Sequence, residues 1–199
     1  MDKRTIDTYN DLAREYDAET ADFWNLFPDA FIDTFAKQAT GKVLDVGSGP
    51  GRDGLLLQKQ GLEVVCLDAS DAMIKLSTDR GLESIIGDFN DLPFSDGSFD
   101  GVWAYTSLLH VPKSEVHKSF SEIARVLKRD GTLGLGMIEG NTELYRESSG
   151  VGLPRWFSFY TREELEDLLA AHGFETTYFE VFKPRTKNYL NFLARKVNL

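Results

Sequence analysis

A run of glycines directly after a short apolar segment is the feature that most constrains the fold of this chain. Residues 42–46 have the length and apolar content of a buried strand, and Gly47, Gly49, Gly51 and Gly54 follow at once. Glycine lets the main chain turn tightly and approach a ligand closely, and the N–H groups of a following helix attract polar or anionic groups. A strand, a glycine turn and a helix in this order predict a ligand-binding loop at the carboxyl edge of a parallel sheet.

Strands and helices alternate through most of the chain. We predict strands at residues 42–46, 62–67, 82–86, 99–104 and 132–138, with helices at 55–60, 70–78 and 113–127. Short turns between them favour a parallel sheet covered by helices on both faces. After a helix at 161–172, the β-like runs 174–182 and 188–197 follow each other without a helix, so we expect them to pair antiparallel.

Two regions lie outside this alternation. Residues 1–40 are polar and helix-favouring, with apolar positions at helical spacing and a second helix near Pro28, which predicts an N-terminal helical cap. Residues 138–160 form a long connection that ends in five residues of which four are aromatic, which favours a lid over a ligand site. The alternative is that these aromatic side chains pack against the last helix.

Length, charge and cysteine content narrow the class of protein. The 199 residues suit one domain, 1–199, and the single Cys66 in an apolar run predicts a buried thiol and no internal disulfide. No apolar stretch approaches the roughly 18 residues that a membrane-spanning helix needs, and the N-terminal residues lack the apolar core of a secretory signal. We therefore expect a cytoplasmic protein without a membrane span.

The net charge of −10 is unevenly distributed. Residues 1–100 hold 20 of the 32 acidic side chains, whereas residues 183–196 hold five basic side chains and no acid. A nucleic-acid surface is therefore disfavoured for the chain as a whole, and a local patch for an anion stays open at its end. Oligomeric state is not indicated by these features.

Five motifs stand in a recognisable order. The sequence Asp45-Val46-Gly47-Ser48-Gly49-Pro50-Gly51 is followed by Asp68 with Ala69, Ser70 and Met73, by Gly87-Asp88-Phe89, and by the segments 99–104 and 127–133. With these motifs the chain resembles the class I S-adenosylmethionine-dependent methyltransferases over residues 40–199, in particular small domains that methylate metabolites. The resemblance implies an α/β, Rossmann-like three-layer sandwich, with a seven-stranded mostly parallel sheet that ends in an antiparallel hairpin.

The resemblance also implies a cofactor site for S-adenosyl-L-methionine. Asp45 would orient the amino group of the methionine, Asp68 would bind the ribose hydroxyls, and Met73 would pack on the adenine. The full set of implied cofactor-binding residues is Asp45, Gly47, Gly49, Gly51, Arg52, Asp68, Ala69, Met73, Asp88, Phe89 and Ala104. Some of these residues have structural alternatives: Asp45 also suits a strand carboxylate with satisfied hydrogen bonds, Met73 also suits a helix core, and Asp88 also suits a turn.

The turn that follows the glycines holds two charged residues. Arg52 is placed either to reach the methionine carboxylate or to solvate the first turn of the helix. Asp53 suits the helix dipole and is positioned to pair with Arg52.

On the substrate side, we expect methyl transfer to a small molecule by in-line displacement. His110 is the candidate general base because it follows the fourth strand and histidine titrates near neutral pH. Tyr105 is a candidate for the methyl pocket, and Trp156 and Tyr160 are candidates for the lid. Tyr9 and Tyr16 share one helical face, which either covers the cofactor or forms ordinary helix core. No spacing of His, Cys or carboxylates predicts a metal site.

Three other functions stay open at this point. Gly49, Gly51 and Gly54 also fit the dinucleotide fingerprint G-x-G-x-x-G, with Asp68 near the spacing of a ribose-binding acid, as in NAD-dependent oxidoreductases. That reading leaves Asp45 and Gly47 without a role. A cofactor-binding module that no longer methylates, acting through a partner, and a macromolecular methyltransferase are the remaining alternatives.

Overall fold

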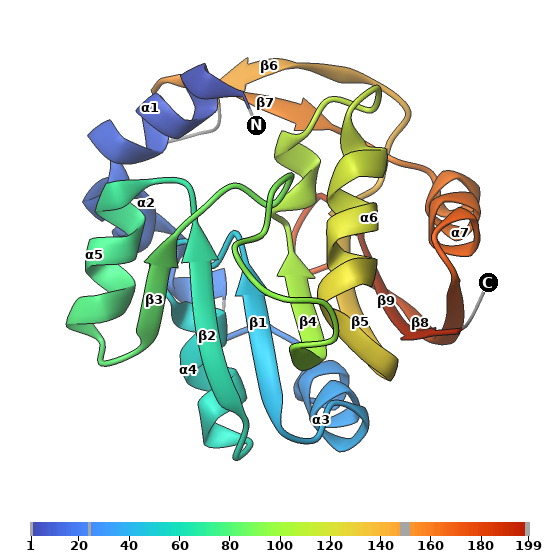
Figure 1. Ribbon diagram of the computed structural model, residues 1–199. Coiled ribbons are helices and arrows are strands. Elements are labelled where there is room, and N and C mark those ends of the chain that lie inside the picture. Colours follow the sequence, from blue (N-terminus) through green and yellow to red (C-terminus); the bar gives the residue numbers. More distant parts are fainter. Residues whose placement is uncertain (1, 24, 148–151, 198–199) are drawn as a thin grey trace.

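Strands that are apolar on both faces build the centre of the molecule. The computed structural model describes residues 2–23, 25–147 and 152–197, and seven strands form one sheet in the order β3-β2-β1-β4-β5-β9-β8 (Figure 1). The strands are β1 (Lys42–Val46), β2 (Glu63–Asp68), β3 (Glu83–Ile86), β4 (Phe99–Tyr105), β5 (Leu127–Ile138), β8 (Phe174–Phe182) and β9 (Tyr189–Lys196). β1 to β5 are parallel, and β9 is antiparallel to both β5 and β8. The predicted fold class, including the terminal hairpin, is confirmed.

Two apolar clusters hold helices against the two faces of this sheet. On one face, α3 (Asp29–Gln38) and α4 (Arg52–Lys59) pack on Val43, Cys66 and Trp103. On the other, α6 (Val116–Val126) and α7 (Arg162–Ala171) pack on Leu44 and Val102. Helix α5 (Asp71–Asp79) lies beside β2 and β3 on the α3–α4 side, where Ser77 of α5 donates a hydrogen bond to Ser84, the β3 residue that pairs with Cys66. Alternate residues of a strand point to opposite faces, so Asp45 lies on the α3–α4 side together with the buried, free thiol of Cys66.

Two short helices cover the carboxyl ends of the strands. A single N-terminal helix was expected, but Leu12 leaves helical geometry (φ −124°, ψ 25°) and divides the segment into α1 (Lys3–Asp11) and α2 (Ala13–Thr20), followed by the 3-10 turn η1 (Ala21–Phe23). The buried residues of α1 and α2 are few (Thr5, Thr8 and Ala13). These helices are therefore held largely by polar contacts, whereas α3 belongs to the core.

The connection predicted as a lid contains two strands that sequence reasoning did not predict. β6 (Glu143–Glu147) and β7 (Pro154–Ser158) pair antiparallel as a separate sheet, and β7 lies against α1. Thr8 donates a hydrogen bond to the Pro154 carbonyl, and the Trp156 N–H donates to the Thr5 hydroxyl. The region thus joins the N-terminal helices above the sheet (Figure 1).

Several element boundaries differ from the prediction. Helix α4 begins at Arg52 instead of residue 55, and α6 spans Val116–Val126 instead of 113–127. Strand β5 begins at Leu127 rather than 132, because Leu127 pairs with Phe99 before a register shift. The two predicted caps are confirmed: Ser70 caps α5, and Thr161 with Glu164 forms a capping box on α7. No helix among the described residues has both the length and the apolar character to cross a membrane.

Candidate active site

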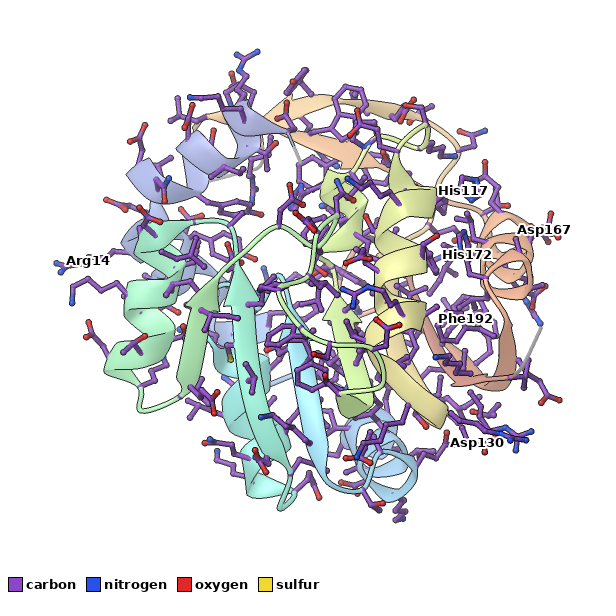
Figure 2. The ribbon with its side chains drawn as sticks, viewed as in Figure 1. Arg14, His117, Asp130, Asp167, His172 and Phe192 are labelled. Atoms are coloured by element: carbon purple, nitrogen blue, oxygen red, sulfur yellow. The ribbon has the colours of Figure 1, made fainter. Side chains whose placement is uncertain are left out.

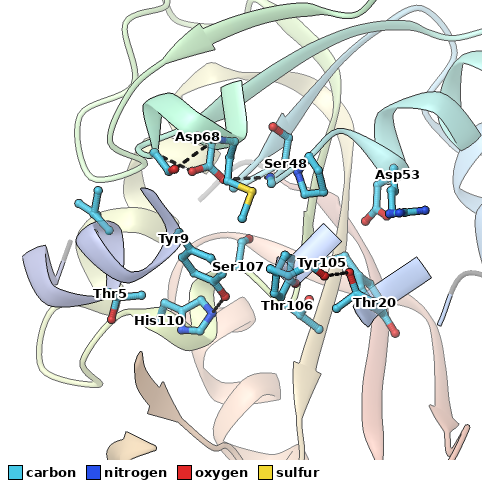
Figure 3. Close-up of a pocket in the computed structure, with 18 of the residues that line it drawn as sticks. Thr5, Tyr9, Thr20, Ser48, Asp53, Asp68, Tyr105, Thr106, Ser107 and His110 are labelled. Carbon is cyan, nitrogen blue, oxygen red and sulfur yellow. Dashed lines mark hydrogen bonds between the residues drawn. The ribbon is translucent and has the colours of Figure 1, made fainter. Parts of the chain in front are cut away.

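A cavity lies between the glycine loop and the N-terminal helices, at the carboxyl ends of β1, β2 and β4 (Figure 3). Five parts of the chain contribute to it: α1 and α2, the loop into α4, the end of β2 with α5, the connection after β3 with Phe89, and the end of β4 with the segment that follows it, which contains the 3-10 turn η2 (Leu108–His110). The residues predicted from the sequence that line it are Tyr9, Tyr16, Gly47, Gly49, Arg52, Asp68, Met73, Phe89, Tyr105 and His110.

The glycine loop needs its glycines at two positions for different reasons. Gly47 has a φ of +68°, and a Cβ there would meet the Cβ of Ser107 at 2.4 Å. Gly49 has a φ of +51°, but a Cβ there would meet nothing within 4 Å, because this residue faces the cavity. The first glycine therefore allows close packing of two loops, and the second leaves its backbone exposed to a ligand.

Asp68 fixes the loop to the end of β2. Its carboxylate accepts hydrogen bonds from the Gly49 N–H (2.9 Å) and the Ser70 N–H (2.8 Å), while the Leu67 carbonyl accepts from the N–H groups of Gly47 and Ser48. Burial raises the pKa of Asp68, and the backbone donors oppose that shift. Each carboxylate oxygen has two lone pairs, so Asp68 can still accept hydrogen bonds from hydroxyl groups of a ligand.

Two carboxyl groups lie close together under the loop. Asp45 is buried beneath it and does not line the cavity; its pKa is raised well above the usual range by burial and by the charges of Asp53 and Asp68, against a hydrogen bond from the Gly54 N–H. Asp53 does line the cavity. Its Oδ2 accepts from the Trp103 indole N–H (2.8 Å), and its Oδ1 is buried with no hydrogen-bond partner among the described residues.

Burial raises the pKa of Asp53 to about 7, against the hydrogen bond from Trp103. Sequence reasoning gave Asp53 no part in the site. A signal was present, because a carboxylate in the first turn of α4 lies at the same end of the sheet as the loop.

The expected pairing of Asp53 with Arg52 is wrong. Arg52 Nε instead donates to Asp17 Oδ1 of α2 (2.8 Å), and Arg80 Nη2 donates to Asp17 Oδ2 (2.6 Å). Arg52 also donates to the Asp17 carbonyl (2.9 Å), and Arg80 donates to the Pro50 carbonyl. Asp17 therefore connects α2 to the glycine loop and to the residue that follows α5.

A chain of hydrogen bonds crosses the other side of the cavity. His110 Nδ1 lies 2.6 Å from the Trp156 carbonyl, which can only accept, so Nδ1 carries the proton. His110 Nε2 then accepts from the Tyr9 hydroxyl (2.8 Å; Figure 3). The same Tyr9 oxygen accepts from Arg155 Nη1 (2.8 Å). Burial and the Arg155 charge lower the pKa of His110 to about 3, so its imidazole is neutral at pH 7.

A second cavity adjoins the first. The two share Tyr9, Tyr16, Thr20, Thr106 and His110, and the second extends toward β7 and the connection between β8 and β9. Sequence reasoning missed Arg155 and Lys187 as lining residues of this cavity, because their strands and loops meet only in the folded chain.

The remaining histidines lie away from both cavities. His117 on α6 and His172 at the end of α7 contact each other at 3.0 Å (Figure 2). Neither lines a cavity described above. Within the described ranges, no group of three or more His, Cys, Asp or Glu side chains could hold a metal ion.

Known proteins match this chain in sequence and in fold. The model of a family described as a methyltransferase domain matches residues 44–135. An uncharacterized methyltransferase of Staphylococcus carnosus is 25% identical over 201 residues, which cover 98% of this chain and 92% of that protein. A demethylmenaquinone methyltransferase of Renibacterium salmoninarum is 33% identical over 67% of this chain, and the chain spans 59% of its length. These matches support a class I S-adenosylmethionine-dependent methyltransferase.

Solved structures of methyltransferases share the fold. A 1,6-didemethyltoxoflavin-N1-methyltransferase of Burkholderia thailandensis, with 1,6-didemethyltoxoflavin and S-adenosylhomocysteine bound, superimposes with a TM-score of 0.70 at 21% identity, over 97% of this chain and 88% of that one. The matches with methyltransferases support S-adenosylmethionine as the cofactor and disfavour the nicotinamide alternative that the glycine spacing left open.

The cavity of this methyltransferase suits that cofactor chemically. S-adenosylmethionine combines a cationic sulfonium and ammonium with a ribose diol, a carboxylate and an adenine ring. The lining offers the buried Oδ1 of Asp53 for a cation, the Asp68 carboxylate for hydroxyl groups, and Met73 and Phe89 for an aromatic ring. Backbone at Gly49 faces the same space.

Several predicted residues do not line this cavity: Asp45, Gly51, Ala69, Asp88, Ala104, Trp156 and Tyr160. Gly51 (φ +81°) packs against Ser77, and Ala104 is buried in the core on the α6 side of the sheet. Tyr160 belongs to the same core, as the packing alternative for the aromatic cluster predicted. Trp156 contributes its carbonyl to His110, a contact that no side-chain pattern could have predicted.

Proposed function

We propose that this enzyme transfers a methyl group from S-adenosylmethionine to a small-molecule acceptor by in-line displacement. The observation that carries the proposal is the pair of adjoining cavities, because the one at the glycine loop suits the cofactor and shares Tyr9, Tyr16 and His110 with the other. In-line transfer needs the two reactants on opposite sides of the methyl group. Two cavities with a common wall provide that arrangement.

Each part of the cofactor has a proposed partner among the lining residues. Asp68 would accept from the ribose hydroxyls, and Met73 with Phe89 would contact the adenine. The backbone at Gly47 and Gly49 would lie along the methionine, and Asp53 would accept from its ammonium group. The predicted residues outside the lining would position the loop and the strand ends that carry these groups. These are Asp45, Gly51, Ala69, Asp88 and Ala104.

Orientation and exclusion of water form the main catalytic contribution in this proposal. The bound cofactor supplies a methyl group made electrophilic by a sulfonium. Tyr9 and Tyr16 line both cavities, and Tyr105 lines the cofactor cavity. Good orientation of the reactants in such a space lowers the free-energy barrier by roughly 7–11 kcal/mol at best. We propose that the cap, residues 1–40, and the lid, residues 138–160 with Trp156 and Tyr160, keep bulk water out.

A general base would act through Tyr9. The Nε2 lone pair of His110 already accepts from the Tyr9 hydroxyl, so an acceptor proton would pass to the Tyr9 oxygen as the Tyr9 proton passes to His110. A His110 pKa of about 3 makes this uptake costly in the free enzyme. His110 therefore serves in this proposal chiefly as a positioning residue for Tyr9.

Cofactor binding provides a direct test. Isothermal titration calorimetry with S-adenosylhomocysteine should give a defined Kd, and Asp68→Ala should raise it by about tenfold or more, since charged hydrogen bonds are each worth roughly 1.5–3 kcal/mol. Asp79→Ala, which removes an exposed carboxylate paired with Lys75, is the matched control and should leave Kd unchanged. Labelled S-adenosylmethionine with a metabolite panel then reports transfer. Binding of NADH in place of S-adenosylhomocysteine would contradict the proposal.

A further inference from the structure

Three basic side chains line the cavity that adjoins the proposed cofactor site. Arg155 comes from β7, and Arg185 and Lys187 come from the connection between β8 and β9. Glu19, an exposed residue of α2, is the acidic side chain among the described residues of this lining. The wall of the second cavity is therefore cationic in a chain with a net charge of −10.

Arg155 is the buried member of this group, with 4% of its surface exposed. The rings of Tyr9, Tyr16 and Phe157 surround its guanidinium, with centroids 5.1, 5.5 and 5.4 Å from Cζ. Its Nη1 donates to the Tyr9 hydroxyl (2.8 Å). The faces of these rings and the Tyr9 hydroxyl hold the guanidinium in place.

Lys187 lies half-buried on the far side of the same cavity. Burial and the positive charges of Arg146 and Arg155 lower its pKa. Neither Lys187 nor Arg185 forms an ion pair with any described residue. Like charges gathered at one cavity repel each other, and an anion placed among them would relieve the repulsion.

The rest of the cavity wall is apolar or aromatic. Phe23, Phe157 and Tyr189 line it together with the basic groups. A molecule that fills this space would therefore meet both rings and cations, with Arg155 directly beside Tyr9 and Tyr16 of the wall shared with the cofactor cavity.

We propose that the methyl acceptor carries an oxyanion, a carboxylate or a phosphate, bound by Arg155, Arg185 and Lys187, and an apolar or aromatic body that packs against Phe157 and Tyr189. This inference rests on the proposed function, since it names the substrate class of that site. The planar fork of an arginine matches either oxyanion in two-point contact, and the lysine adds a compact charge.

The test uses three small probes that differ in charge. Benzoate and phenyl phosphate carry the two oxyanions on a ring, and benzamide is the neutral counterpart of benzoate. Titrations of the ¹⁵N-labelled full-length enzyme with saturating S-adenosylhomocysteine, followed by NMR, give Kd for each probe. We expect at least one oxyanion to bind about tenfold more tightly than benzamide, and the preferred one identifies carboxylate or phosphate. Shifts should concentrate at residues 155–157 and 184–189.

Variants in one loop assign the effect to the basic groups. The double variant Arg185→Gln with Lys187→Gln should raise the Kd of the oxyanion by about tenfold. Lys183→Gln removes an exposed charge from the same connection outside the cavity lining, and should change Kd by less than about twofold. All three substitutions are in a surface loop, so we expect the variants to fold. The NMR spectrum of each variant checks the folded state.

Each outcome decides a separate question. Equal binding of benzoate, phenyl phosphate and benzamide, or an equal loss in Lys183→Gln and the double variant, overturns the anion site. S-adenosylhomocysteine binding is measured beforehand on the same sample. An enzyme that binds the oxyanion at residues 155 and 184–189 but not S-adenosylhomocysteine would support the anion site and contradict the proposed function.

Discussion

The raised pKa of Asp53 is the residue-scale feature with the clearest consequence. Asp53 faces the cavity with an unpaired Oδ1 and a pKa of about 7, raised by burial. It is ionised above pH 7 and protonated below, so its attraction for a ligand cation grows with pH. We expect the affinity for S-adenosylhomocysteine to rise by up to about tenfold from pH 6 to pH 8, and Asp53→Asn to remove this dependence. Calorimetry at several pH values measures it.

The same residue gives the stability of the free enzyme a pH dependence of known sign. The folded-state pKa of Asp53 lies above its ordinary value of 3.8. Between pH 3.8 and about pH 7, the folded state therefore binds more protons than the unfolded chain. The contribution of the protonated group to stability is therefore fully present below pH 3.8 and is lost as pH rises through about 7. The melting temperature of Asp53→Asn should vary less between pH 5 and pH 8 than that of the parent. An identical pH profile for the two proteins would assign the titration elsewhere.

At the scale of elements, α2 depends on one carboxylate. The Asp17 carboxylate accepts hydrogen bonds from Arg52 and Arg80, and the three side chains are only 17% to 24% exposed. Apolar packing of α2 is small by comparison, because Ala13 is its buried residue. Asp17→Asn should therefore loosen α2 and not the sheet. We expect amide hydrogen exchange in residues 13–20 to accelerate about tenfold or more, which corresponds to roughly 1.5–3 kcal/mol of lost charged hydrogen bonds, with exchange in β1 and β4 unchanged. Asp7→Asn, which breaks an exposed pair with Lys3, is the control and should have an effect below about twofold. Equal acceleration throughout the chain would mean that Asp17 supports the whole fold.

The elements also show how far the sequence determines local structure. Strands β1, β2 and β4 were predictable because their apolar runs are bounded by turn residues, and α5 and α7 because Ser70 and Thr161 cap them. The break at Leu12 and the strands β6 and β7 were not, since nothing in their local pattern requires them. β6 is exposed throughout, and β7 is ordered by contacts with Thr5 and Thr8 of α1, residues about 150 positions away.

At the scale of the whole molecule, the motifs predicted where the site lies better than which atoms form it. Gly47, Gly49, Asp68 and Met73 line the cavity as the resemblance implied, because each follows a strand at the same edge of the sheet. Asp45 does not, and Asp53 takes the position facing the cavity, because strand alternation directs Asp45 beneath the loop. Contacts such as that of His110 with the Trp156 carbonyl join segments 46 residues apart and depend on the complete fold.

Ligand binding should therefore stabilise the molecule as a whole, because the cofactor cavity is lined by α1, α2, the glycine loop and the segment after β4. At a hundredfold excess of S-adenosylhomocysteine over its Kd, the native state gains about 2.7 kcal/mol. For a chain of this length each kcal/mol shifts the melting temperature by about 2–4 °C, so we expect a rise of about 5–10 °C in a fluorescence melt. A further tenfold increase in ligand should add about 3–5 °C, while NADH at the same concentrations should add none. A melting temperature that does not depend on the concentration of S-adenosylhomocysteine would show that this cavity does not bind the adenosyl ligand.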